Sequence, residues 1–141
     1  MILYLDTSSL IKLYVEESGS EATGRLMAQA SVASTSVVAY PEMRAALARL
    51  RRNDALTSLD HDRITRALDD DWPRLLTVGV TERIYRHAGD LAEKHALRGF
   101  DSLHLASYLA VVAQRGSSQR IRFSSFDNLL NRAANQEAQR I

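Results

Sequence analysis

The chain has 141 residues, of which 45% are hydrophobic and 25% are charged, as is typical of one soluble globular domain. The formal net charge is +1, which excludes a molecule that binds nucleic acid through its overall charge. Cysteine is absent, so disulfides and thiolate metal sites are excluded.

Short apolar or β-branched runs alternate with helical patterns along the chain. The runs predict four strands, at residues 1–5, 31–35, 75–78 and 121–124. Apolar periodicity and capping residues predict helices at residues 7–15, 20–30, 36–52, from 57 or 60 onward, 81–96, 100–113 and 126–134. Gly99 is expected to break the chain before the sixth helix, and residues 116–118 to form a loop. The alternation favours a single α/β domain, residues 1–141, with a mostly parallel sheet.

Polar residues are expected to cap the first three helices. Thr7 or Ser8 would cap the first helix, Ser20 the second and Ser36 the third. Pro41 falls within the third helix and is tolerated there only near the first turn or at a kink.

The N-terminal region predicts a cytoplasmic protein. Its apolar start follows no basic segment and is interrupted by Asp6. No apolar run approaches the roughly 18–20 residues that are needed to span a bilayer. The lack of cysteine also fits a reducing compartment. We therefore expect a cytoplasmic location and no membrane partner.

Four carboxylates stand where a strand ends or a helix begins, namely Asp6, Glu42, Asp101 and Asp127. In parallel sheets, sites form beyond the carboxyl ends of the strands, so the predicted architecture gathers these acids. Ionised carboxylates that converge repel each other and are tolerable only with a cation among them. Hard oxygen ligands suit Mg²⁺ or Mn²⁺, which act on phosphates. The pattern therefore predicts a metal-dependent phosphodiesterase, and most plausibly a nuclease.

Polar and basic residues surround these acids in the sequence. Thr7, Ser8 and Ser125 are placed to hydrogen-bond the carboxylates or metal-bound waters, or simply to cap helices. Arginines cluster near the end of the predicted third helix, at Arg44, Arg49, Arg51 and Arg52. They form either a solvated face or a basic rim that binds a phosphate backbone of the substrate.

The motifs around the acids resemble those of PIN-domain ribonucleases. Residues 3–14, LYLDTSSLIKLY, are close to that family's opening, and residues 99–106, GFDSLHLA, are close to its third acidic motif. Residues 125–127, SFD, match the fourth motif with serine where threonine is common, and Glu42 matches the remaining acid. The ordered set covers nearly the whole chain. It is most similar to the VapC-type toxins of VapB–VapC toxin–antitoxin pairs.

This resemblance implies a three-layer α/β/α PIN-like fold with a short central sheet of four or five strands. The fifth strand is in question because residues 135–141 lack the glycine-containing turn that often precedes it. The resemblance also implies an endoribonuclease whose four acids, Asp6, Glu42, Asp101 and Asp127, hold Mg²⁺ or Mn²⁺. The implied partners are an RNA substrate, a VapB-like antitoxin that covers the acidic site, and a second copy of the chain in a homodimer.

His104 lies one helical turn after Asp101, and this spacing would suit a metal ligand. Because the resemblance implies a site built from carboxylates, a structural or supporting role is the better interpretation of this histidine.

Other functions remain compatible with the same residues. They are a metal-dependent phosphatase or a DNA-directed nuclease on a similar framework, and a PIN-like module that binds RNA or protein without efficient catalysis.

Overall fold

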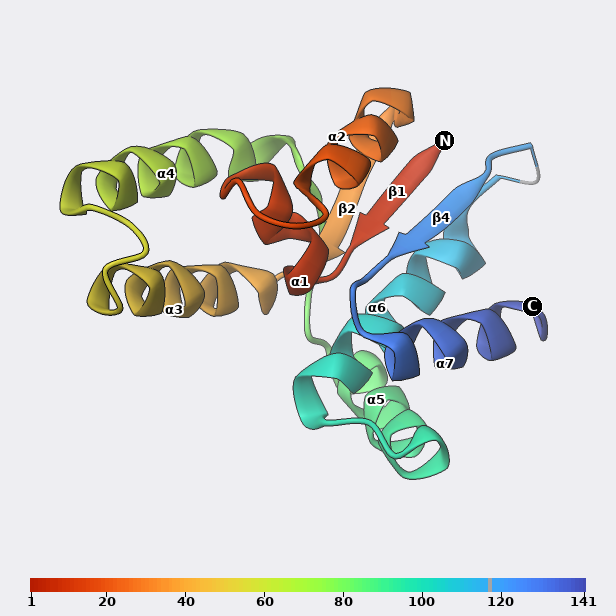
Figure 1. The fold of residues 1–141 in the computed structure, drawn as a ribbon. Helices are drawn as coiled ribbons and strands as arrows, with labels where there is room; N and C mark the ends of the chain where they lie inside the picture. Colours follow the sequence, from red (N-terminus) through yellow and green to blue (C-terminus); the bar gives the residue numbers. More distant parts are fainter. Residues whose placement is uncertain (117) are drawn as a thin grey trace.

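The computed structural model describes residues 1–116 and 118–141, and its core is a four-stranded parallel sheet (Figure 1). The strands are β1 (Ile2–Leu5), β2 (Val32–Ser36), β3 (Leu76–Val78) and β4 (Ile121–Ser124). Their order in the sheet is β3-β2-β1-β4, so β1 is a central strand that pairs with both β2 and β4. Each strand lies within one residue of its predicted position. The loop predicted at 116–118 includes Ser117, which lies outside the described residues.

Helices occupy the connections between the strands. They are α1 (Thr7–Leu10), the 3-10 helix η1 (Ile11–Leu13), α2 (Ser20–Gln29), α3 (Ala39–Arg52), α4 (Ser58–Asp71), the 3-10 helix η2 (Trp72–Arg74), α5 (Glu82–His95), α6 (Gly99–Gln114) and α7 (Asn128–Ala138). Figure 1 shows α1 to α4 on one side of the sheet and α5 to α7 on the other. The predicted three-layer α/β/α fold is therefore confirmed. None of the helices in the described ranges is long and apolar enough to cross a membrane.

The central strand β1 separates two hydrophobic cores. Its side chains alternate, with Ile2 and Tyr4 packed among α5, α6 and α7, and Leu3 and Leu5 packed against η1, α3 and α4. All four are at most 6% exposed. A strand that is buried on both faces reads as a continuous apolar run, which is why the sequence signal for β1 was strong.

Several helix boundaries differ from the predictions because other residues cap the helices. Asp6, rather than Thr7 or Ser8, caps α1, which gives way after Leu10 to the short 3-10 helix η1 instead of continuing to residue 15. Gly19 precedes α2 with a φ of 96°, a left-handed conformation that favours glycine, and the Ser20 hydroxyl donates to the Val15 carbonyl instead of capping.

The third helix begins later than predicted because Ser36 belongs to β2. Its hydroxyl accepts a hydrogen bond from the Val38 backbone N–H, and α3 begins at Ala39 without a side-chain cap. Pro41 therefore falls in the first turn, where its missing N–H costs no helical hydrogen bond.

The break before the sixth helix lies at Ala96 rather than at Gly99. Ala96 adopts the left-handed conformation at the end of α5, with a φ of 53°, and Gly99 is the first residue of α6. The last helix, α7, spans Asn128–Ala138 instead of 126–134 because Asp127 caps it. The fifth strand that the family resemblance left open is absent from the described residues.

An ion pair connects the last helix to α5. Glu137 is buried on α7, and the Lys94 ammonium donates to both of its carboxylate oxygens. Burial pushes the pKa of Glu137 upward, but hydrogen bonds from Lys94 and His95, together with the charges of Lys94 and Arg140, outweigh it and hold that pKa below its ordinary value.

We predict that Glu137→Gln lowers the free energy of unfolding by about 1 kcal/mol at pH 7, because it removes a charge-assisted hydrogen bond. A carboxyl with a lowered pKa stabilises the fold above its unfolded pKa, which is about 4.3, and loses this contribution as the pH falls. Urea denaturation between pH 7 and pH 3 should therefore show the difference from wild type shrinking toward acid. A difference that stays constant with pH would contradict this role.

Candidate active site

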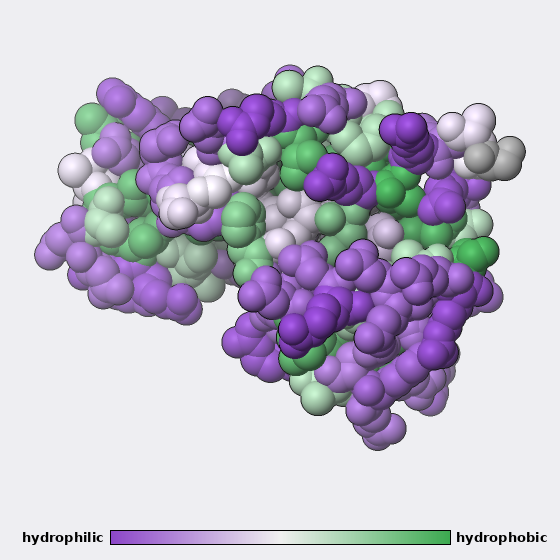
Figure 2. Space-filling view, turned by 45° about the vertical axis from the view of Figure 1, so that its right-hand side comes forward, coloured by the Kyte–Doolittle hydropathy of each residue, from purple (hydrophilic) through white to green (hydrophobic). Residues whose placement is uncertain are grey.

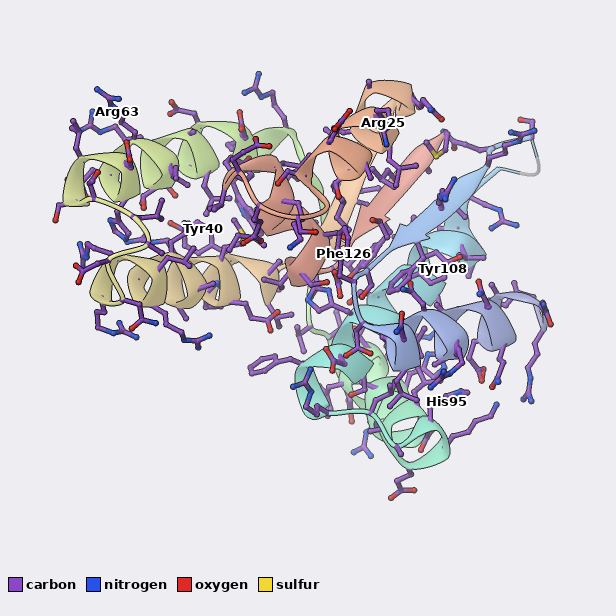
Figure 3. The ribbon with its side chains drawn as sticks, viewed as in Figure 1. Arg25, Tyr40, Arg63, His95, Tyr108 and Phe126 are labelled. Atoms are coloured by element: carbon purple, nitrogen blue, oxygen red, sulfur yellow. The ribbon has the colours of Figure 1, made fainter. Side chains whose placement is uncertain are left out.

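A cavity of about 340 Å³ opens at the carboxyl ends of β1 and β4. It is lined by Asp6, Thr7, Ser8, Glu42, Arg98, Asp101, His104, Phe126 and Asp127. All four acids that the sequence singled out thus reach one cavity, although they come from four separate segments of the chain. Figure 3 shows Phe126 near the middle of the molecule, beside α1 and above the start of α7, where it borders this cavity.

Asp6 is the most rigidly held acid in the cavity. Its Oδ1 accepts from the Ser8 hydroxyl at 2.7 Å and from the Ser9 backbone N–H at 3.0 Å, and its Oδ2 accepts from the Ser125 hydroxyl at 2.6 Å. Only 4% of the residue is exposed. Burial raises the pKa of Asp6 above its ordinary value, while the hydrogen bonds from Ser125 and Ser8 counteract that shift.

Asp6 combines two roles, as the cap of a helix and as a member of the cavity wall. Asp6 caps α1 through Oδ1 and at the same time presents its carboxylate to the cavity. The Ser125 hydroxyl that donates to Asp6 also accepts from the Asp127 backbone N–H at 3.0 Å, so one side chain connects two of the acids.

Glu42 is held by a histidine and a threonine. Its Oε1 accepts from Thr7 Oγ1 at 2.6 Å and lies 3.0 Å from His104 Nε2. Burial pushes the pKa of Glu42 upward, but hydrogen bonds from His104 and Thr7 outweigh burial and lower it. Glu42 is therefore ionised at neutral pH.

His104 is buried, at 2% exposure, and connects Glu42 to the central strand. Its Nδ1 lies 2.9 Å from the Tyr4 hydroxyl, and its Nε2 is shared between Glu42 and Thr7. The contacts with Tyr4 and Glu42 are both satisfied by one neutral tautomer of His104. In it, Tyr4 donates to Nδ1 and the Nε2–H group donates to Glu42. The histidine therefore positions the carboxylate of Glu42. This is the structural or supporting role that the sequence analysis favoured over metal binding.

Arg98 pairs with the other two acids, Asp101 and Asp127. Its Nε donates to Asp101 Oδ2 at 3.0 Å, and its Nη2 lies 3.6 Å from Asp127 Oδ2. Hydrogen bonding to Asp101 raises the pKa of Arg98. The other Asp127 oxygen, Oδ1, accepts from the Leu130 backbone N–H and caps α7.

The donor set of the cavity fits a hard divalent cation. It consists of carboxylate and hydroxyl oxygens, and the hydrogen bonds to Glu42 converge on Oε1, so Oε2 faces no protein donor among the described residues. In residues 1–116 and 118–141, however, no three acidic or histidine side chains lie close enough to hold an ion as they stand. Binding an ion thus requires movement of the less rigid acids and of Arg98.

The predicted basic rim is only partly assembled next to the acids. Arg49 lines a larger groove that adjoins the cavity. Arg44 instead donates to the Tyr40 hydroxyl, which points toward α4 and donates to Asp69 (Figure 3). Arg51 lies beside His61, and Arg52 is exposed at the end of α3. Of these four described arginines, one is thus placed near the acids.

Sequence reasoning missed Arg98 as a member of the site. Its position three residues before Asp101 is the signal that was available, since residues at this spacing lie close together at the start of a helix. The contact between His104 and Tyr4 had no such local signal, because the two residues are 100 positions apart.

Comparisons with known proteins show which family the sequence matches. Residues 3–135 match the family model described as PIN domain. The chain is 43% identical over 110 residues to Ribonuclease VapC45 of Mycobacterium tuberculosis strain CDC 1551 / Oshkosh, covering 78% of this chain and 76% of that protein. It has the same identity and coverage with Ribonuclease VapC49 of Mycobacterium tuberculosis strain ATCC 25618 / H37Rv.

Solved structures share the fold at low sequence identity. A chain in the crystal structure of FitAcB from Neisseria gonorrhoeae superposes with a TM-score of 0.66 at 18% identity, covering 96% of this chain and 94% of that one. A chain in the crystal structure of VapBC2 from Rickettsia felis, bound to a DNA fragment from its promoter, gives 0.57 at 13% identity, covering 89% and 100%.

We predict that His104→Leu lowers the free energy of unfolding by about 2–4 kcal/mol, because it takes away the buried partner of the Tyr4 hydroxyl and of Glu42. A double-mutant cycle with Tyr4→Phe, measured by urea denaturation, should give a coupling of about 1 kcal/mol between the two side chains. Strictly additive effects would mean that the Tyr4–His104 contact contributes nothing to the fold.

Proposed function

The chain belongs to the PIN-domain family and, within it, to the VapC ribonucleases, and from this premise we propose that it is a metal-dependent endoribonuclease acting as a toxin. The observation that carries the proposal is the cavity in which Asp6, Glu42, Asp101 and Asp127 meet at one edge of the sheet. Hydrolysis of RNA phosphodiester bonds is the reaction that this arrangement serves best.

The four acids would hold Mg²⁺ or Mn²⁺, with the hydroxyls of Thr7, Ser8 and Ser125 orienting carboxylates or bound waters. When bound, such an ion supplies Lewis-acid chemistry, because it withdraws charge from a phosphate oxygen and makes a water more acidic. Asp6 would be the fixed point of the ligand set, since three hydrogen bonds orient its carboxylate. Asp101 and Asp127 would complete it once Arg98 moves.

Glu42 is the residue best suited to orient the attacking water. Thr7 and His104 keep it ionised and fix its carboxylate, so it can accept a proton from that water. The water oxygen then forms a bond to phosphorus, the bond from phosphorus to the 3′-oxygen breaks, and the departing 3′-oxygen takes up a proton from solvent while Glu42 returns its own proton to solvent. The products are a 3′-hydroxyl on the upstream fragment and a 5′-phosphate on the downstream one.

Arg98 would change partners during this reaction. Its guanidinium, which donates one hydrogen bond to Asp101, is able to bind two oxygens of a phosphate in a bidentate manner. An incoming phosphate would thus draw Arg98 away from the acids and leave them to the cation.

The partners follow from the same proposal. We propose a VapB-like antitoxin as the inhibitor, a homodimer as the assembly and the cytoplasm as the location. The contact of Arg98 with Asp101 supports inhibition by an arginine-bearing segment, because it shows that the cavity acids accept a guanidinium.

We predict that Asp6→Asn keeps the fold and reduces RNA cleavage by more than about 100-fold. Loss of a residue that only supports a metal ligand typically costs roughly 10- to 100-fold, and a direct ligand should cost more. Asparagine has the same shape and preserves the acceptor for Ser8 and Ser9, whereas it removes the charge that binds the cation. Cleavage of total cellular RNA would be followed on gels with Mg²⁺, with Mn²⁺ and with EDTA. The matched control is Asp70→Asn, an exposed acid on α4. Undiminished cleavage in EDTA would refute metal dependence.

We predict that expression of the wild-type chain in a bacterium without an antitoxin arrests growth, and that Asp101→Asn relieves the arrest. The physical reason is that Asp101 contributes one of the four charges, so its loss weakens cation binding. Growth curves and immunoblots would be compared with those of Asp70→Asn, which should remain toxic. Arrest by Asp101→Asn at an equal protein level would show that toxicity does not depend on this site.

A further inference from the structure

A groove of about 930 Å³ adjoins the acid cavity and shares Glu42, Arg98 and Asp101 with it. Its walls are Arg49 of α3, one face of α5 and the first turn of α6. The space-filling view shows the molecule hollowed between the α3–α4 lobe and the lobe of α5 to α7 (Figure 2). The volume falls in the range of roughly 300–1,000 Å³ that is typical of pockets for small organic ligands.

The groove combines apolar and cationic groups in separate places. Tyr85 and Phe100 line it and are 50% and 55% exposed, so about half of each residue is open to solvent. On α5, the rest of the wall beside Tyr85 is made of small residues, Ala88, Gly89 and Ala92. Arg98 stands where the groove meets the acid cavity.

These groups match a nucleotide whose base is not paired. Single-stranded RNA is bound by aromatic side chains that stack on its bases and by arginines that contact its phosphates. A phosphate in the acid cavity would place the next nucleotide of the strand in the adjoining groove, because the two share a wall. A base within a duplex is unable to enter, since its faces are covered by neighbouring bases.

We propose that this groove binds the single-stranded nucleotide next to the scissile phosphate, with Phe100 stacking on its base, Tyr85 bordering the same base, and Arg98 and Arg49 contacting the backbone. The inference rests on the proposed ribonuclease function and adds to it the residues that bind the substrate beside the reacting phosphate. A protein segment is the less favoured occupant, because the groove runs directly into the four acids where the phosphate reacts.

The first experiment replaces Phe100 to test whether its aromatic ring stacks on an RNA base. Binding of a fluorescein-labelled, unstructured RNA of about 12 nucleotides to the Asp6→Asn protein would be measured by anisotropy in Mg²⁺, beside the blunt duplex of the same sequence. Adding Phe100→Ala or Phe100→Leu should weaken single-strand binding about 5- to 100-fold, whereas Phe100→Trp should retain it. Leucine keeps apolar bulk without a π-face, so it separates stacking from apolar packing. The duplex should bind weakly and respond to none of these changes.

The second experiment fills the groove without disturbing the fold. A Cβ added at Gly89 meets no atom within 4 Å, and the same holds at Gly24 on α2, which is remote from the groove. Both are exposed helical glycines, so leucine should stabilise either helix slightly. Gly89→Leu should weaken single-strand binding at least about 10-fold, within the cost of losing one stacked base. Gly24→Leu should bind as the parent protein does.

The outcomes separate this inference from the proposed function. Suppose that the wild type cleaves RNA with metal, and that Phe100→Leu and Gly89→Leu bind RNA as the parent protein does. The proposed ribonuclease function would stand, but this result would refute the proposed nucleotide-binding role of the groove. Conversion of a dimer to a monomer by Gly89→Leu in sedimentation velocity, with unchanged RNA binding, would also overturn it by assigning the groove to a second copy of the chain. A wild type that neither binds nor cuts any RNA would refute both proposals.

Discussion

Mutual repulsion among four carboxylates at one edge of the sheet is the constraint on which the rest of the site depends. Each charge is balanced in a different way. Asp6 is buried and receives three hydrogen bonds, Glu42 is held by His104 and Thr7, and Asp101 and Asp127 share Arg98. The balance is strongest deep in the cavity and weakest at its mouth, where exchange of Arg98 for a cation is least costly.

The fold was largely predictable because the strands carry strong local signals. The β1 run is apolar on both faces, and helices that begin at genuine capping residues, such as α4 after Thr57 and α5 after Thr81, start where the sequence places them. Predictions failed where two residues competed for one role. Ser36 has the chemistry of a cap but continues β2, and Ala96 reverses the chain although Gly99 is the better candidate by propensity. Tertiary packing decides such cases, and a single sequence does not encode it locally.

In the candidate site, the four acids were predictable from the sequence, but most of their hydrogen-bond and ion-pair partners were not. The four acids follow from where strands end, because a parallel sheet brings those ends together. No comparable rule predicts which side chains contact the four acids and balance their charges. His104 on α6 contacts Tyr4 on β1, 100 positions away, and Arg98 joins acids from α6 and from the segment before α7. Such contacts depend on how layers dock, so they emerge only when side chains are placed in three dimensions.

The wide separation of the four acids along the chain has a consequence for synthesis. Residues 6, 42, 101 and 127 come together only through long-range contacts, and β4, which supports the last of them, pairs with β1 across more than a hundred positions. A ribosome-bound fragment that ends before β4 lacks both the edge strand and the final carboxylate. Translation itself therefore delays the appearance of a complete cavity until Asp127 has emerged.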